Sequence, residues 1–201
     1  MAVASACAHG ASASIVTLSD FSSEPGIDPS VLSATLDFTV GPGNFLTLIG
    51  ANSPSSPTPV DEFNINQIFF NASANVSNLA IDTFPAQWFL DTTGTMVREW
   101  GVFDFKVFHG HETGPPHHLI LPGAFETFVF SFDGVGITEN DFVLELSDVS
   151  DNPDHMPMFA AAKFVQGPNN ESAFGAVPEP GVLAMLAIAG LFGARRRRLA
   201  A

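Results

Sequence analysis

Leu32-Ser-Ala-Thr-Leu-Asp-Phe-Thr-Val40 is the stretch of this 201-residue chain that decides its fold class. Every second side chain from Leu32 to Val40 is apolar, and the side chains between them are serine, threonine or aspartate. Because successive side chains of a β-strand point to opposite faces of a sheet, this alternation creates one apolar and one polar face. The stretch therefore predicts a strand with one face in a hydrophobic core and the other in water.

Further segments of the same character follow along the chain. After the turn Gly41-Pro-Gly43, strands are predicted over 45–49, 63–70, 76–81, 97–108, 128–132, 142–146 and 159–165. The segment 97–108 is expected to carry its apolar side chains on one face: Val97, Phe103, Phe105 and Val107. Roughly seven to nine short strands joined by Gly, Pro, Asn and Asp turns are typical of an antiparallel β-sandwich of immunoglobulin-like or jelly-roll type. The pattern predicts a mainly β fold, followed by a single hydrophobic helix at the C-terminus.

The N-terminus and the region after the last predicted strand differ from this body. Ala11-Ser-Ala13 has the small-x-small pattern of a signal-peptide cleavage site, so residues 1–13 are predicted to be the remnant of a truncated secretory signal peptide. An ordinary flexible Ala/Ser-rich terminus is the alternative. Residues 14–165 are the predicted acidic sandwich domain, and residues 166–176, rich in Gly, Pro, Asn and Ser, are predicted to be a flexible linker.

Residues 177–201 combine three features in a fixed order. These are Val177-Pro178-Glu179-Pro180, an uncharged apolar run from Gly181 to Ala194, and the block Arg195, Arg196, Arg197 and Arg198. As a helix the apolar run extends about 21 Å against a hydrocarbon core of about 30 Å, and snorkelling arginine side chains narrow the gap. Residues 181–194 are therefore predicted to be a transmembrane helix. The arginines are its predicted cytoplasmic anchor, because cationic flanks resist translocation.

This order of features resembles the PEP-CTERM sorting signal of Gram-negative bacteria. The resemblance implies a substrate of an exosortase, a membrane-embedded cysteine transpeptidase-like enzyme that would cleave near the motif. The protein would then pass to the cell surface or the exopolysaccharide matrix. Val177, Pro178, Glu179 and Pro180 would be the processing motif. An ordinary tail anchor that happens to begin with Pro-Glu-Pro is the alternative.

Charge separates the body of the chain from this tail. Before Val177 there are three basic residues (Arg98, Lys106 and Lys163) and twenty acidic ones, a net charge of −17. Such a surface repels nucleic acid and anionic headgroups, so no nucleic-acid partner is expected. The single cysteine, Cys7, lies in the predicted signal peptide, so the body is expected to fold without disulfides or thiol chemistry.

Two groups of side chains are candidates for metal binding. Four of the six histidines lie in ten residues, and imidazole with carboxylate suits Zn²⁺ or Cu²⁺; the candidate ligands are His109, His111, Glu112, His117 and His118. The oxygens of Asp148, Asp151 and Asp154 suit Ca²⁺. Neither group has the spacing of a closed zinc motif or an EF-hand, and polar loops and turns are the alternative. No other cofactor is expected.

The sequence offers few further candidate site residues. Trp88 and Trp100 are the candidates for stacking on sugar rings, with core packing as the alternative. No nucleophile elbow, zincin helix or phosphate-binding loop is present in the sequence, and nothing marks one carboxylate pair among the many.

We therefore expect an exported, non-enzymatic surface or matrix protein of unknown ligand, associated with biofilm or exopolysaccharide. A secreted carbohydrate-binding module and a secreted polysaccharide hydrolase are the alternatives. The expected partners are the Sec translocase, an exosortase-like enzyme, the cytoplasmic membrane and extracellular polysaccharide. A membrane-anchored precursor with a cytoplasmic C-terminus is expected to precede the form at the cell surface or in the matrix.

Overall fold

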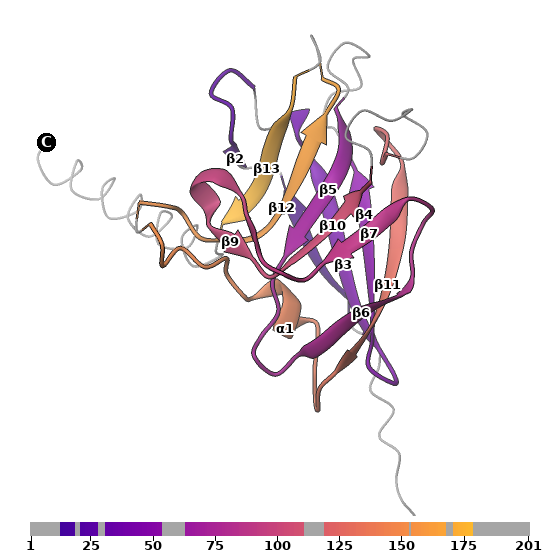
Figure 1. Cartoon of the computed structure of the whole chain (residues 1–201). Helices are drawn as coiled ribbons and strands as arrows, with labels where there is room; N and C mark the ends of the chain where they lie inside the picture. Colours follow the sequence, from indigo (N-terminus) through magenta and orange to yellow (C-terminus); the bar gives the residue numbers. More distant parts are fainter. Residues whose placement is uncertain are drawn as a thin grey trace, which may run out of the picture.

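The computed structural model describes residues 13–18, 21–27, 31–53, 63–110, 119–152, 154–167 and 171–178. These residues form two antiparallel sheets that pack face to face (Figure 1). Sheet A has the strand order β1-β3-β4-β11-β6, and sheet B has the order β2-β13-β12-β5-β10-β7. The prediction of a mainly β fold with antiparallel sheets is confirmed.

The elements have the following bounds. Sheet A consists of β1 (Ala13–Leu18), β3 (Ala34–Gly41), β4 (Phe45–Asn52), β11 (Phe125–Asp133) and β6 (Ser77–Thr83). Sheet B consists of β2 (Phe21–Ser22), β13 (Ala173–Pro178), β12 (Met158–Val165), β5 (Asn64–Phe70), β10 (Phe105–His109) and β7 (Trp88–Asp91). A small hairpin contains β8 (Thr95–Met96), the 3-10 helix η2 (Arg98–Trp100) and β9 (Val102–Phe103), and the short helix α1 spans Asn140–Val143.

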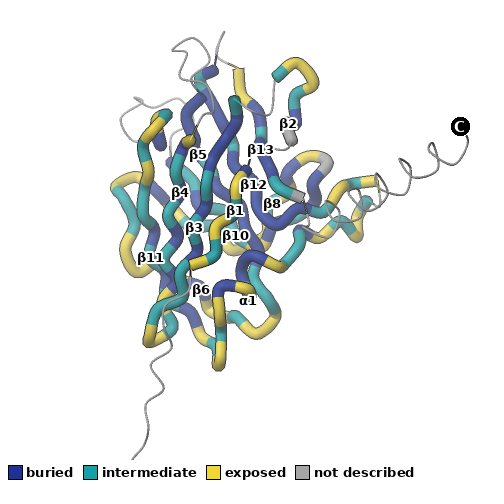
Figure 2. Tube along the Cα trace, turned by 180° about the vertical axis from the view of Figure 1, so that it is seen from behind, coloured by how far each residue is buried: buried dark blue, intermediate teal, exposed yellow. Residues whose placement is uncertain are grey.

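The main core lies between the two sheets and follows from the alternation in the sequence. In β3, Leu36 and Phe38 are fully buried, while Asp37 between them is partly exposed. Buried segments run along the strands of both sheets (Figure 2). The Phe38 ring meets Phe70 of sheet B edge-on, with centroids 5.7 Å apart, and Phe70 meets Phe130 of β11 at 5.8 Å. Such edge-to-face pairs add to the free energy gained by burying the rings. The apolar faces predicted for these strands therefore meet across the sandwich.

A second, smaller group of buried side chains covers the opposite, outer face of sheet B. We call it the outer cluster; it comprises Phe69, Val97, Trp100, Phe103, Met158, Ala161 and Ala176, with Phe174 packed against it. The prediction that 97–108 is one strand with a single apolar face is wrong. Phe103 belongs to the outer cluster and Val107 to the main core. Between them the backbone N–H of Asp104 donates to Asn71 Oδ1 at 3.0 Å, which interrupts the strand.

A strand was also predicted over 142–146, and this prediction is wrong. The chain there forms the single turn α1, and Leu144 is half exposed. The carboxylate of Asp141 accepts hydrogen bonds from the backbone N–H and the hydroxyl of Thr138, at 2.9 and 3.2 Å. A side chain that bonds the backbone three residues earlier stabilises the start of a helical turn, and this local preference overrides the apolar alternation.

Two edges of the predicted sandwich domain also differ from expectation. The first described strand, β1, begins at Ala13, the last residue of the predicted signal-peptide remnant. At the other end, the flexible linker predicted over 166–176 is wrong for Ala173–Ala176, because these residues belong to β13. Sheet B therefore continues to Pro178, and the sandwich reaches the Val-Pro-Glu-Pro motif directly.

Candidate functional site

Strand β13 carries the start of the Val-Pro-Glu-Pro motif into sheet B. It pairs antiparallel with β12, and Val177 lies opposite Ala160. The ladder ends at Pro178, opposite Met158. Proline has no backbone N–H and cannot donate a further ladder bond, so this residue is a natural end for the strand. The first half of the motif is therefore the end of a sheet strand.

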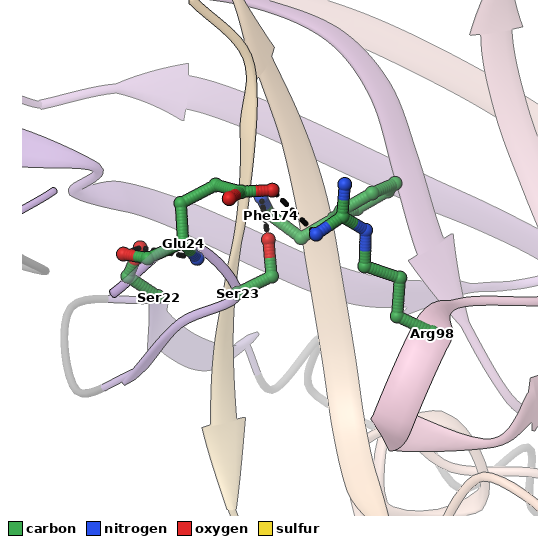
Figure 3. A network of polar contacts seen from close by, with 5 residues as sticks. All are labelled: Ser22, Ser23, Glu24, Arg98 and Phe174. Atoms are coloured by element: carbon green, nitrogen blue, oxygen red, sulfur yellow. Dashed lines mark hydrogen bonds and ion pairs between the residues drawn. The ribbon is translucent and has the colours of Figure 1, made fainter. Parts of the chain in front are cut away.

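On its other side β13 is paired with the short strand β2. Ala176 lies opposite Phe21, and the pairing is extended by Ser23. The Ser23 backbone N–H donates to the Phe174 carbonyl at 3.0 Å, and the Phe174 N–H donates to Ser23 Oγ at 2.9 Å (Figure 3). Strand β13 is thus an inner strand of sheet B, held by backbone hydrogen bonds on both sides.

The β8–β9 hairpin covers β13 from the outer face of the sheet. The Phe174 ring lies edge-on to Trp100, with centroids 6.3 Å apart, and 5.8 Å from Phe69. Arg98 of η2 forms an ion pair with Glu24, the residue after Ser23, so that the hairpin and β2 are joined across β13 (Figure 3). The two charged side chains are 51% and 33% exposed, and an exposed pair of this kind contributes at most about 1 kcal/mol.

The buried side chain of Ser147 and a close backbone approach at Gly101 hold the β8–β9 hairpin in place. The hydroxyl of Ser147 donates to the Trp100 carbonyl and accepts from the Met158 N–H at 2.9 Å, which ties the hairpin to β12. Gly101 has φ 83°, and a Cβ there would lie 2.3 Å from the Asp148 carbonyl oxygen. Only glycine fits such a close approach of two backbones. The outer cluster therefore depends on a few specific residues outside the strands.

Comparison with known families identifies the segment that leaves this strand. Residues 176–198 match the PEP-CTERM protein-sorting motif. The chain carries a PEP-CTERM sorting signal. This confirms the resemblance, and the signal implies an exported protein with a membrane-anchored C-terminal sorting region that an exosortase-type system processes. No curated protein and no solved structure matches the chain.

The sorting motif and the folded domain overlap. Ala176, Val177 and Pro178 belong both to β13 and to the matched segment. Glu179, Pro180, the predicted helix at 181–194 and the block Arg195–Arg198 lie outside the described residues. Within the described part of the chain, no helix has the length and apolar character needed to cross a membrane.

The two tryptophans do not form the predicted sugar-stacking platform. Trp88 is 4% exposed and Trp100 is 3% exposed. Trp88 packs edge-on against Phe128 in the main core at 5.1 Å, and Trp100 packs against Phe174 in the outer cluster. The stacking prediction for these two residues is wrong because neither indole presents a ring face to solvent.

The structure describes only part of the predicted metal ligands. His109 is 2% exposed at the end of β10, with its ring 5.9 Å from Trp88, while His111, Glu112, His117 and His118 lie outside the described residues. Among the residues that the structure does describe, no three His, Cys, Asp or Glu side chains come together to hold a metal ion.

The three aspartates of the Ca²⁺ prediction are among the described residues, and they do not converge. The carboxylate of Asp148 instead accepts hydrogen bonds from the backbone N–H and hydroxyl of Ser150, which lower the pKa of Asp148. Asp151 and Asp154 lie in the same surface turns. Binding of Zn²⁺, Cu²⁺ or Ca²⁺ stays a prediction.

An exposed aromatic patch that the sequence did not single out lies at the β7 edge of sheet B. Phe89 is 49% exposed, and its ring centroid is 5.7 Å from that of Phe108, its cross-strand partner on β10. Lys106 Nζ lies 4.8 Å from the Phe108 centroid and 2.9 Å from a carboxylate oxygen of Asp91. We call these four residues the Phe89 patch. The pairing of β7 with β10 creates it, so no single segment of sequence signals it.

Hydrogen bonds favour the ionised form of Asp91 in the Phe89 patch. The hydroxyl of Thr93 and the ammonium group of Lys106 donate to Asp91, and they hold the pKa of its carboxyl group well below its usual range. Across the same face, Gln67 lies opposite Phe108, and Lys163 lies opposite Gln67. A row of two aromatic side chains followed by two polar ones therefore crosses four strands of sheet B.

Proposed function

We propose that this protein is exported and that an exosortase-type enzyme separates its β-domain from the C-terminal signal. The domain then joins the cell surface or the extracellular polysaccharide matrix as a non-enzymatic component. The observation that carries the proposal is the sorting motif at 176–198, which continues directly from a folded sheet strand. The charge of the body supports it, because a net charge of −17 keeps a released domain soluble and away from anionic membrane surfaces.

Residues 177–201 account for the steps that precede release of the domain. Export through the Sec translocase brings the domain across the cytoplasmic membrane. The apolar run 181–194 then holds the precursor there, with Arg195–Arg198 on the cytoplasmic side. Separation of the acidic domain from the four arginines leaves a product with a strongly negative net charge, which suits dispersion in a polysaccharide matrix.

The proposal is tested by a variant that alters the motif without touching β13. The full chain and the double variant Glu179→Ala/Pro180→Ala are produced in the native cells, and each is located by fractionation and mass spectrometry. We expect the natural chain in the surface or matrix fraction without Arg195–Arg198, and the variant in the cytoplasmic membrane with its arginines intact. Glu171→Ala/Pro122→Ala is the matched control outside the motif. Natural chain in the matrix with an intact arginine block would contradict the proposal.

Glycan binding is a second candidate function, and the Phe89 patch favours it. An exposed aromatic ring stacks on the apolar face of a sugar, and neighbouring polar groups bond its hydroxyls. The Phe89 ring is held in place, because it pairs with Phe108 and lies against Gly110, where a Cβ would be 2.6 Å from the ring. Gln67 and Lys163 supply polar groups on the same face.

This candidate is tested with the domain and extracellular polysaccharide purified from the native cells. In calorimetric titration, Phe89→Ala is expected to weaken binding about two- to thirteenfold, since an aromatic contact contributes about 0.5–1.5 kcal/mol. Phe125→Ala is the control, because Phe125 is 65% exposed on sheet A, away from the patch. Equal losses in both variants would contradict a site at Phe89, and turnover of the polysaccharide would favour a hydrolase.

A further inference from the structure

The overlap between sheet B and the sorting motif restricts where the chain can be cut. A protease or transpeptidase acts on an extended segment whose backbone groups are free. A bond inside a paired strand becomes available only when that strand opens, and the rate of cutting then follows the population of the open state. Ala176–Pro178 are both motif and strand. A cut within these residues would therefore require β13 to open first.

Upstream of Val177 the backbone of β13 is held from two sides. Ala176 is opposite Ala161 on β12 and opposite Phe21 on β2, and Phe174 bonds Ser23 through both its N–H and its carbonyl. The side chain of Ala176 is also buried in the outer cluster. Opening this part of the strand would break two ladders and expose buried apolar surface.

Loss of β13 would also expose an aggregation-prone edge strand, β12. Its neighbour β12 has the sequence Met158-Phe-Ala-Ala-Ala-Lys-Phe-Val165, and seven of these eight residues are buried. Without β13 this apolar strand would become an edge with unpaired N–H and C=O groups, which promotes pairing with other chains. A soluble matrix protein therefore needs β13 after processing as well as before it.

Strand β13 extends to Pro178 in the part of the chain that the structure describes. The pairing with β2 ends at Ala176, and the ladder to β12 ends at Pro178. Only Glu179 and Pro180 then separate the sheet from the apolar run that starts at Gly181, a span of about 7 Å if extended. The chain between the end of β13 and the apolar run is therefore short.

We propose that the processing cut lies on the C-terminal side of Pro178, so that the mature domain keeps the whole of β13. The proposal rests on the exosortase sorting proposed above. In this step one peptide C–N bond breaks, and its carbonyl carbon bonds to the oxygen of water or to the oxygen or nitrogen of an acceptor hydroxyl or amine. The released amine takes up the proton that the incoming group loses.

Mass spectrometry of the mature protein from its native cells is the first test. We expect a last residue at position 178 or beyond. A free carboxylate there indicates water as the acceptor, and an added mass indicates a hydroxyl or amine acceptor. A last residue at position 177 or earlier would overturn the proposal.

A disulfide between β12 and β13 is the second test. Ala161→Cys/Ala176→Cys joins two residues that lie opposite each other in the outer cluster, and the two single variants are the controls. Each purified full chain is added to membranes that contain the processing enzyme. We expect the oxidised double variant to be processed within about twofold of its reduced form, because opening of β13 is not needed. Processing that stops on oxidation and returns on reduction would overturn the proposal.

Folding of the double variant is checked by its thermal melt, and Lys163→Cys/Phe174→Cys, an opposed pair outside the matched motif, is the second pair if the first does not fold. The two proposals fail in different ways. A natural chain that is never processed would contradict the sorting proposal, whereas a processed chain that lacks part of β13 contradicts only the position of the cut.

Discussion

The main core and the outer cluster bury aromatic side chains on opposite faces of sheet B, but they are built in different ways. The main core is formed by regular strands of both sheets, as the contact of Phe38 and Phe130 with Phe70 shows. The outer cluster relies on the β8–β9 hairpin, which is held by Ser147 and by the close approach at Gly101. The main core therefore stabilises the whole domain, while the outer cluster stabilises the strand that leads to the sorting motif.

Removal of the Phe70 ring from the main core should distinguish the main core from the outer cluster most clearly. Phe70 is fully buried and contacts Phe38 and Phe130 of sheet A as well as Phe105 of sheet B, so Phe70→Ala is expected to lower the free energy of unfolding by about 3–5 kcal/mol. Denaturant unfolding followed by fluorescence and by circular dichroism should show one coincident, shifted transition. A loss below about 1 kcal/mol would mean that the two sheets do not share one core.

Trp100→Ala should have a large but more local effect. The indole is 3% exposed, and we expect a loss of about 3 kcal/mol, at the lower end for such substitutions because the cluster can relax toward solvent. Hydrogen exchange should rise most in 173–178, since the contact between Trp100 and Phe174 is lost. Phe45→Ala, at a 38% exposed ring on sheet A, is the control. An equal rise in hydrogen exchange across both sheets in Trp100→Ala would show that the outer cluster is not a separate unit.

Ser147→Ala should release the hairpin from β12 without removing an apolar side chain. It leaves the Trp100 carbonyl and the Met158 N–H without their partner, which costs about 1–3 kcal/mol for buried groups. Limited proteolysis should then cut within 95–103 faster than in the natural protein. Ser77→Ala, at an exposed serine on β6 of sheet A, is the control. Equal cutting rates in both variants would contradict the role of Ser147.

Arg98→Ala should change stability by less than about 1 kcal/mol, because its ion pair with Glu24 is exposed. The small difference from the natural protein should shrink further in high salt, and thermal melts at low and high ionic strength measure it. A salt-independent loss above about 1 kcal/mol would show that Arg98 stabilises β13 by packing and not by charge.

The smallest effect is expected in the Phe89 patch and concerns pH. The folded-state pKa of Asp91 lies below the ordinary value of 3.8, so its stabilising contribution is present above that pH and is lost as the pH falls below it. Asp91→Asn should therefore remove part of the acid dependence of the melting temperature between about pH 5 and pH 2. An unchanged acid dependence in the variant would contradict the contacts of Asp91 with Thr93 and Lys106.

Several elements could be predicted because their signal is local. The alternation in 32–40 and 128–132 locates β3 and β11, since each apolar face is written in consecutive residues. The sorting signal could be predicted for the same reason, because its motif, apolar run and arginine block follow one another in the chain. The helix α1 was missed because hydrogen bonds between Thr138 and Asp141 outweigh an alternating pattern.

By itself, the sequence determined the β class, the apolar strand faces that form the main core, and the C-terminal sorting signal. Strand periodicity and sorting signals can be recognised because they depend on neighbouring residues. Tertiary structure decided the place of β13, the burial of Trp88 and Trp100, and the exposure of the Phe89 patch. Residues 173–178 read as part of a linker or a signal, and they become a strand only because β12 and β2 lie on either side of them. Pairing between distant segments leaves no periodic trace within a segment, so the overlap of fold and sorting motif is visible only in three dimensions.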